Sequence, residues 1–209
     1  MLKFYHAPWS RSFCIFWLLE ELGASYEMEL VDIRGKVPEG YRQIQPSNKV
    51  PAIVHDGRVV TERAAIALYL GEIFGEKGLT PTVGDPDRAA YLTMLVYHDS
   101  VFDPVICAKA HQLNYVSNDY PFGTFDDMLG YLERVFASRP FIAGDRFTVA
   151  DVIWGTGISY TMNVLKALPE RPFFTEYLNR VINRPAYQRT LTRDTELASK
   201  EPSLQSHIN

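Results

Sequence analysis

The chain has 209 residues, of which 46% are apolar, and its formal net charge at pH 7 is −4. This length and apolar content can bury one large core or two modest ones, and the acidic balance argues against the clustered basic face that nucleic-acid binding requires. No apolar run of about 18 residues occurs, so we expect no membrane span.

The chain opens with a short predicted strand over residues 2–5 and a predicted helix over residues 13–22. The turn between them, residues 6–12, reads His-Ala-Pro-Trp-Ser-Arg-Ser. A strand that enters a helix through this turn places Ser10 or Ser12 at the helix N-terminus. There a hydroxyl and the positive end of the helix dipole point at one spot.

The most informative stretch is residues 48–63, which predicts a strand, a tight Asp-Gly turn, a second strand and a helix start. Pro51 cannot donate a ladder hydrogen bond, so it must begin a strand or lie at an edge, where the preceding residue can face an extended ligand. Thr61 is a good N-cap, which places the amides of Glu62 and Arg63 at a helix start that favours an anion. An edge for a peptide backbone beside a socket for its carboxylate indicates a small peptide ligand.

The element order predicts two domains, one α/β and one all-α. Residues 1–76 follow the order β-α-β and then β-β-α, with a strand over 26–31 and a Gly/Pro-broken segment over 33–46. This is the order of a thioredoxin-like domain with a mixed four-stranded sheet and helices. Residues 77–87 have a linker composition, and residues 88–209 have a helical period that predicts a C-terminal helical bundle.

Within the helical domain, Asp103-Pro104 is expected to kink or break the first long helix. The polar last dozen residues are expected to fray. Later helices are predicted at about 124–137, 149–166 and 171–182.

A capping box is predicted where Thr148-Val-Ala-Asp151 begins a helix, with Phe147 and Val152 placed to form a hydrophobic staple. We therefore interpret Asp151 as a structural residue and not as a catalytic one.

Four segments together resemble the cytosolic glutathione transferases, in the bacterial group whose active-site residue is a serine. Each segment alone is only moderately specific, but the four occur in the right order and spacing, and the resemblance covers roughly the whole chain. The segments are residues 5–12, 45–52, 61–66 and 141–151.

The resemblance implies that a serine hydroxyl donates a hydrogen bond to the glutathione thiolate. Lowering a thiol pKa from about 8.5 by two units takes about 2.7 kcal/mol, which a hydrogen bond to a charged group (about 1.5–3 kcal/mol) and a helix N-terminus (about 0.3–1 kcal/mol) can supply. Ser10 aligns with the family's catalytic serine. Ser12 is expected to cap the helix and to lie among the glutathione-binding residues. The alternative is that both serines only cap the helix. His6 and Cys14 are interpreted as structural residues.

The resemblance also assigns the rest of glutathione. The backbone of Val50, ahead of a cis Pro51, is implied to pair with the cysteinyl backbone, and Glu62 with the next residue to hold the γ-glutamyl group. That next residue is usually a serine in the family and is Arg63 here, so its side chain either pairs with the carboxylate or points to solvent. Lys36 is a candidate for the glycine carboxylate or a solvated surface residue, and Lys49 is a weaker candidate.

The second substrate is expected to be apolar and to contact aromatic side chains of the helical domain. The alternative is that an aromatic helical face belongs to the core. The candidates are Trp9, Tyr97, His98, Phe102 and Trp154, with Tyr91 and Tyr115 also considered.

The expected function is that of a glutathione transferase active in detoxification, with glutathione as co-substrate and a small hydrophobic electrophile as partner. The alternatives are a glutathione-dependent dehalogenase, isomerase or peroxidase, or a non-catalytic binding or scaffold protein on the same fold. The resemblance implies a homodimer in which the first domain of one subunit packs on the helical domain of the other. Two cysteines and a strand-like start favour the cytoplasm, and the five histidines lack metal-site spacing, so we expect no metal.

Overall fold

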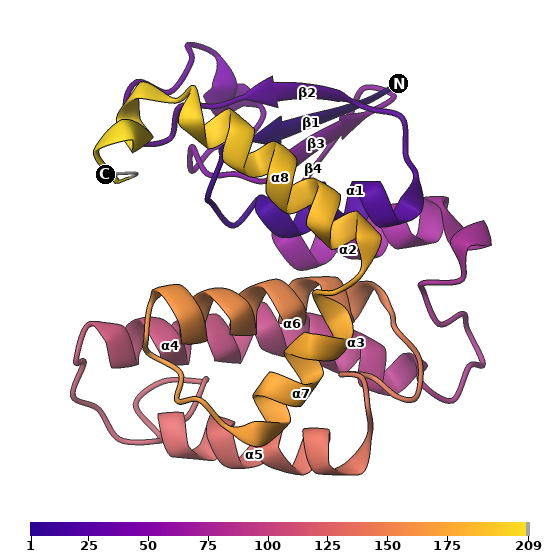
Figure 1. Cartoon of the computed structure of the whole chain (residues 1–209), viewed down its shortest axis with the longest axis vertical. Helices are drawn as coiled ribbons and strands as arrows, with labels where there is room; N and C mark the ends of the chain where they lie inside the picture. The colour runs from indigo at the N-terminus through magenta and orange to yellow at the C-terminus, as the bar shows by residue number, and fades with distance from the viewer. Residues whose placement is uncertain (208–209) are drawn as a thin grey trace. The chain divides into compact units, whose positions relative to one another are not determined.

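The computed structural model describes residues 1–207 and divides into two compact units (Figure 1). Residues 1–74 form the first unit together with the described chain from Arg184 onward, and residues 75–183 form the second. The domain limits predicted from the sequence remain a proposal. None of the helices in the described part of the chain has the length and apolarity that a membrane crossing requires.

The first unit is built on a four-stranded mixed sheet in the order β2-β1-β3-β4. β1 pairs in parallel with β2, and the β1–β3 and β3–β4 pairs are antiparallel. The predicted thioredoxin-like sheet is therefore confirmed. The strands are β1 (Leu2–His6), β2 (Glu27–Leu30), β3 (Ala52–His55) and β4 (Arg58–Thr61).

The helices α1 (Phe13–Leu22) and α2 (Arg63–Ile73) pack together, and α2 also contacts β3 and β4. α1 ends where Gly23 adopts a left-handed φ of 61°, as expected for a glycine C-cap. The Gly/Pro-broken segment contains one short 3-10 helix, η1 (Tyr41–Gln43).

The start of α2 differs from the prediction that Thr61 caps it. Thr61 still belongs to β4, where it pairs with Ala52, and the N-cap is Glu62 with φ 66° and ψ 125°. Sheet pairing thus overrides the intrinsic capping preference of threonine.

The helix α8 (Pro185–Ser199) lies in the stretch predicted to be helical, but its bounds were not predicted, and it packs on α1 of the first unit (Figure 1). Tyr187 meets Trp17 edge to face at 4.9 Å between ring centroids. Arg184 holds the Glu21 carboxylate through two hydrogen bonds of 2.7 and 2.8 Å. Within the last dozen residues, where fraying was expected, a 3-10 helix, η5 (Pro202–His207), follows α8. The last two residues of that prediction lie outside the described residues.

The second unit is helical, as predicted. The first long helix changes to a π-helical turn just before Pro104, which lies in the first turn of the next helix. The elements are η2 (Gly75–Lys77), α3 (Arg88–Tyr97), η3 (His98–Phe102), α4 (Asp103–Ala110), α5 (Phe125–Ser138), α6 (Val149–Ser159), η4 (Tyr160–Val164) and α7 (Pro172–Val181).

The predicted capping box of α6 is confirmed, and the Thr148 N–H donates to the Asp151 carboxylate at 2.8 Å. Replacing Thr148 with alanine is expected to lower the free energy of unfolding by about 1 kcal/mol, because a cap is lost. Urea denaturation measures this effect. Thr156→Ala is the matched control, because Thr156 lies inside the same helix and its hydroxyl donates to Val152 O at 2.9 Å. Equal losses for the two variants would contradict a special role for the cap.

Candidate functional site

Strand register brings three segments of the first unit to one edge of the sheet. β1 and β3 pair Tyr5 with Ala52, so Ala7 and Val50 each lie two residues beyond this pair. β3 and β4 pair Ala52 with Thr61, so Pro51 and Glu62 each lie one residue beyond this pair. The turn after β1, the start of β3 and the start of α2 therefore meet at this edge.

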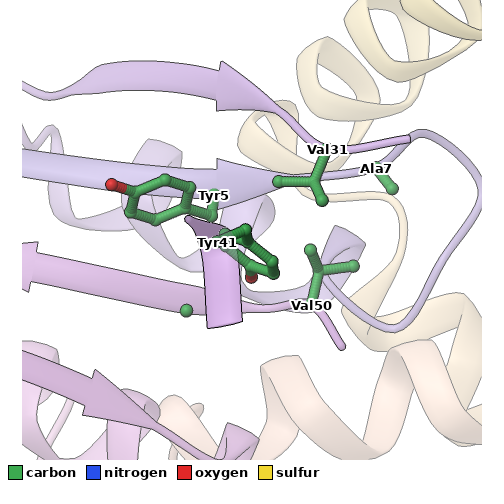
Figure 2. Close-up of a cluster of buried hydrophobic side chains, with 6 residues drawn as sticks. Tyr5, Ala7, Val31, Tyr41 and Val50 are labelled. Carbon is green, nitrogen blue, oxygen red and sulfur yellow. The ribbon is translucent and has the colours of Figure 1, made fainter. Parts of the chain in front are cut away.

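A buried hydrophobic cluster lies under this edge, and Figure 2 shows Ala7, Val31 and Val50 close together at the ends of neighbouring strand segments. Tyr41 packs on Tyr5 with ring centroids 5.3 Å apart. The remaining member of the cluster is Ala52. The cluster fixes the turn after β1 against the start of β3.

The Tyr41 hydroxyl holds the chain just before the edge, because it donates to Lys49 O at 2.7 Å. Burial raises the pKa of Tyr41, so the phenol keeps its proton and remains a donor. The Val50–Pro51 peptide bond is cis, as the resemblance implies, and the Val50 side chain is buried.

The turn after β1 is clamped from two sides. The Arg34 guanidinium donates to Pro8 O at 3.1 Å and to Trp9 O at 2.8 Å. The Trp9 N–H donates to the Asp194 carboxylate at 3.1 Å. These bonds hold Trp9 at a positive φ of 52°, and the residue stays 40% exposed. The turn that presents Ser10 is thus held by hydrogen bonds from a loop and from α8.

The two serine hydroxyls of the turn have different surroundings. Ser10 is half-buried, and its Oγ lies 2.7 Å from Ala7 O and accepts the Ser12 N–H at 3.1 Å. Ser12 is fully buried, with its Oγ 2.8 Å from His6 Nδ1. The expected helix-capping bond of the Ser12 hydroxyl is not made, because that hydroxyl faces the imidazole. Ser10 is accordingly the serine of this pair that a ligand can reach.

Glu62, at the N-terminus of α2, has a strained backbone. Its φ of 66° with ψ of 125° lies outside the left-handed helical region, a kind of conformation that costs about 1–3 kcal/mol and concentrates at functional sites. The side chain is exposed, and Glu62 O accepts the Ile66 N–H at 2.9 Å. Arg63, the first residue of α2, is half-buried.

Replacing Glu62 with glycine is expected to raise the free energy of unfolding by about 1 kcal/mol relative to Glu62→Ala. Glycine adopts a positive φ without a Cβ clash, whereas alanine retains the clash. Urea denaturation of the two variants side by side measures the difference. If the alanine variant is as stable as the glycine variant, the strain assigned to Glu62 is wrong.

The two lysine candidates are exposed. Lys36 lies in a loop ordered by Asp32, whose carboxylate accepts the N–H groups of Arg34, Gly35 and Lys36 at 3.2, 2.7 and 3.2 Å. Lys49 directly precedes Val50, and its carbonyl is fixed by Tyr41.

Three of the aromatic candidates lie in the core of the second unit, which corrects their assignment to a substrate pocket. His98, Phe102 and Trp154 are 0% exposed, with ring centroids 5.0–5.1 Å apart. Trp154 donates its indole N–H to Met94 O at 2.9 Å. Tyr97 is half-buried, and burial raises its pKa to about 12.

Metal-ligand atoms gather elsewhere in the described chain, within 4.8 Å of one another, at His98, Asp99 and Asp103. This group lies in the second unit. His98 Nδ1 and Asp99 Oδ1 already share a hydrogen bond of 3.0 Å.

Three polar residues at the site were missed or assigned only a structural role from the sequence: His6, Arg34 and Asp194. A signal for Asp194 exists in the spacing of α8, where every fourth residue from 186 to 198 is small or polar and yet buried. Such a stripe indicates a helix face that packs closely on another element.

Comparisons with known proteins agree with this geometry. The family described as "Glutathione S-transferase, N-terminal domain" matches residues 8–73. Glutathione S-transferase 3 of Schizosaccharomyces pombe is 28% identical over 171 residues, covering 72% of this chain and 70% of the relative. A solved glutathione transferase from Methylococcus capsulatus has a TM-score of 0.78 at 28% identity, covering 93% of this chain and 99% of that one. A sphingomonad glutathione S-transferase complexed with glutathione has a TM-score of 0.75 at 25% identity, covering 92% of this chain and 98% of that one.

Proposed function

The chain belongs to the glutathione S-transferase family, and from this premise we propose that Ser10 ionises the thiol of bound glutathione for attack on a small hydrophobic electrophile. The observation that carries the proposal is that Ser10 is half-buried, and not sealed like Ser12, in the turn that meets the start of β3 and of α2. The natural electrophile is proposed only as a class.

The chemistry needs no general base from the protein. The thiol proton leaves to solvent, and the thiolate is stabilised by the Ser10 hydroxyl and by the N-terminus of α1, which begins at Phe13. The thiolate then forms a bond to an electrophilic carbon, and the leaving group departs with the electron pair of the broken bond, which gives a thioether. The thiolate is the nucleophilic form of sulfur.

The remaining contacts follow the same edge. In this proposal the Val50 backbone pairs with the cysteinyl unit, and the amides at Glu62 and Arg63 receive the γ-glutamyl carboxylate, where the helix start favours an anion. The Arg63 guanidinium adds a charge-assisted hydrogen bond in place of the usual serine hydroxyl. Lys36 or Lys49 meets the glycine carboxylate.

Isothermal titration calorimetry with glutathione tests whether the site binds its co-substrate. We expect saturable binding at or below millimolar concentration, followed by turnover against at least one class among halides, epoxides, enones and hydroperoxides. Absence of binding at millimolar glutathione would contradict the proposal and favour a non-catalytic scaffold protein. The Lys109→Ala variant is a control and should bind glutathione like the wild type, because the proposal gives Lys109 no contact with glutathione. The Lys109 ammonium lies over the Phe125 ring within the second unit.

We further propose that the protein is a cytoplasmic homodimer. Analytical ultracentrifugation at micromolar concentration is expected to give twice the mass of the 23.8 kDa chain. A single monomeric species at that concentration would refute the dimer.

A further inference from the structure

A chain of hydrogen bonds runs from α8 to the proposed thiol-binding hydroxyl. Asp194 Oδ1 lies 2.7 Å from His6 Nε2, and His6 Nδ1 lies 2.8 Å from Ser12 Oγ. Ser12 Oγ in turn lies 2.7 Å from Ser10 Oγ. All four side chains belong to the first unit, and we call them the relay.

The inner members of the relay are sealed from solvent. His6 and Ser12 are 0% exposed and Asp194 is 1% exposed. Buried polar groups are costly unless they are hydrogen-bonded, and a buried carboxylate especially so. Only Ser10, at the outer end, is partly open to a ligand. The relay thus connects a buried carboxylate with a reachable hydroxyl.

Both oxygens of Asp194 are used. Oδ1 faces His6, while Oδ2 accepts the Trp9 N–H at 3.1 Å. An ionised carboxylate only accepts hydrogen bonds, so His6 Nε2 donates its proton to it. One side chain of α8 therefore fixes both the imidazole and the backbone of the turn that carries Ser10.

The neighbours of Ser10 leave its proton available for a ligand. Its oxygen accepts the Ser12 N–H at 3.1 Å and touches Ser12 Oγ, which also receives the Ala7 N–H at 3.2 Å. With the proton of His6 on Nε2, Ser12 donates to His6 Nδ1, so Ser10 supplies the proton of the 2.7 Å contact with Ser12 Oγ. Ala7 O, at 2.7 Å, is the other neutral acceptor within reach of the Ser10 proton. A thiolate is a charged acceptor and competes well against these neutral oxygens for that proton.

We propose that Asp194 and His6 are positioning residues for thiol ionisation, which hold the Ser10 oxygen in place through Ser12. This inference rests on the proposed role of Ser10. Reacting groups must be held within about 0.5 Å of the productive geometry, and a misplacement of about 1 Å can cost a hundredfold. Neither residue touches glutathione in this account.

The test is a double-mutant cycle on the ionisation constant of the bound glutathione thiol. The ultraviolet absorbance of the thiolate measures this constant in each variant. Asp194→Asn keeps an oxygen that can accept the Trp9 N–H, but it places an amide NH2 toward His6 Nε2. This forces the other imidazole tautomer and reverses the hydrogen bond between His6 and Ser12. Ser12→Ala cuts the relay between His6 and Ser10 but leaves the Asp194–His6 pair and the packing of α8. Each change is expected to lower the ionisation constant about tenfold, and the double variant should also lose about tenfold, since residues in one network are not additive.

Thr190→Ala is the control for disturbance of α8. Thr190 is 0% exposed and lies one turn before Asp194 on the same helix. Its hydroxyl donates to Ala186 O at 2.8 Å, and Thr190 is not a member of the relay. If Asp194→Asn does not fold, His6→Asn replaces it in the cycle, because asparagine places a polar atom near Nδ1 and none near Nε2.

The outcomes separate this inference from the proposed function. If the wild type ionises glutathione and Ser10→Ala does not, while Asp194→Asn behaves like Thr190→Ala, the positioning role is wrong and the proposed function stands. A hundredfold loss in the double variant would also overturn the relay, because it would show two independent effects. A wild type that leaves glutathione as the thiol overturns both.

Discussion

Replacing Ser10 with alanine is expected to lower kcat/KM for thioether formation about ten- to hundredfold. The lost hydrogen bond to a charged sulfur is worth about 1.5–3 kcal/mol, and about 1.36 kcal/mol corresponds to a factor of ten. Glutathione affinity should change little, because the contacts proposed at Val50 and Glu62 do not involve this hydroxyl. Steady-state kinetics with a chromogenic aryl halide measures the effect.

Two variants make the Ser10 result interpretable. Ser10→Thr retains a hydroxyl and should recover part of the rate. Ser100→Ala removes an exposed hydroxyl of the second unit, one that bonds Val96 O, and should leave the rate unchanged. A Ser10→Ala enzyme with wild-type kcat/KM would show that the hydroxyl has no part in the reaction.

Replacing Asp151 with alanine is expected to lower the free energy of unfolding by about 3–5 kcal/mol, the largest stability effect that we anticipate. Its carboxylate is fully buried and accepts hydrogen bonds from the N–H of Ile142 and of Thr148 at 2.8 Å, and from the Tyr177 hydroxyl at 3.0 Å. Removing the acceptor leaves several buried donors unpaired at once. Urea denaturation at neutral pH measures the loss, and a loss similar to that of Thr148→Ala would contradict this role.

The stability contribution of Asp151 also depends on pH. Burial raises the pKa of Asp151 to about 6 despite the opposing N–H donors, whereas an unfolded aspartate titrates near 3.9. Between these values the folded chain binds a proton that the unfolded chain has lost, so stability falls as the pH rises from about 4 to about 6. Relative to Asp151→Asn, the free energy of unfolding of the wild type should fall by about 3 kcal/mol between about pH 4 and about pH 6, and it should not change further at higher pH. A difference that is flat with pH would contradict the raised pKa.

Local sequence signals predicted the first unit well. The Asp-Gly turn forms the β3–β4 hairpin with positive φ at Asp56 and Gly57, and Gly23 ends α1. These positions are decided by backbone conformation, which the residue type determines directly. The same holds for the capping box of α6.

The bounds of α8 escaped prediction because the buried face of this helix is not apolar. Its buried stripe includes Thr190 and Asp194 among alanines, so this stretch lacks the periodic large apolar residues that predict an amphipathic helix. Only packing against α1 reveals that these polar residues face inward. Asp194 was therefore missed, although His6, Ser10 and Ser12 were each considered.

Three of the aromatic candidates were placed in a pocket for a different reason. A helical period of aromatic residues predicts a buried face but does not distinguish a packed core from a pocket that a substrate fills. His98, Phe102 and Trp154 pack on one another. The choice between Ser10 and Ser12 likewise depended on burial, which the turn sequence alone does not determine.

A pH titration of glutathione bound to the wild-type protein tests the central claim most directly. The ultraviolet absorbance of the thiolate should rise with a midpoint about two units below the pKa of about 8.5 for a free thiol, and in the Ser10→Ala complex the midpoint should return close to that of free glutathione. A wild-type complex whose sulfur titrates like free glutathione would contradict the account.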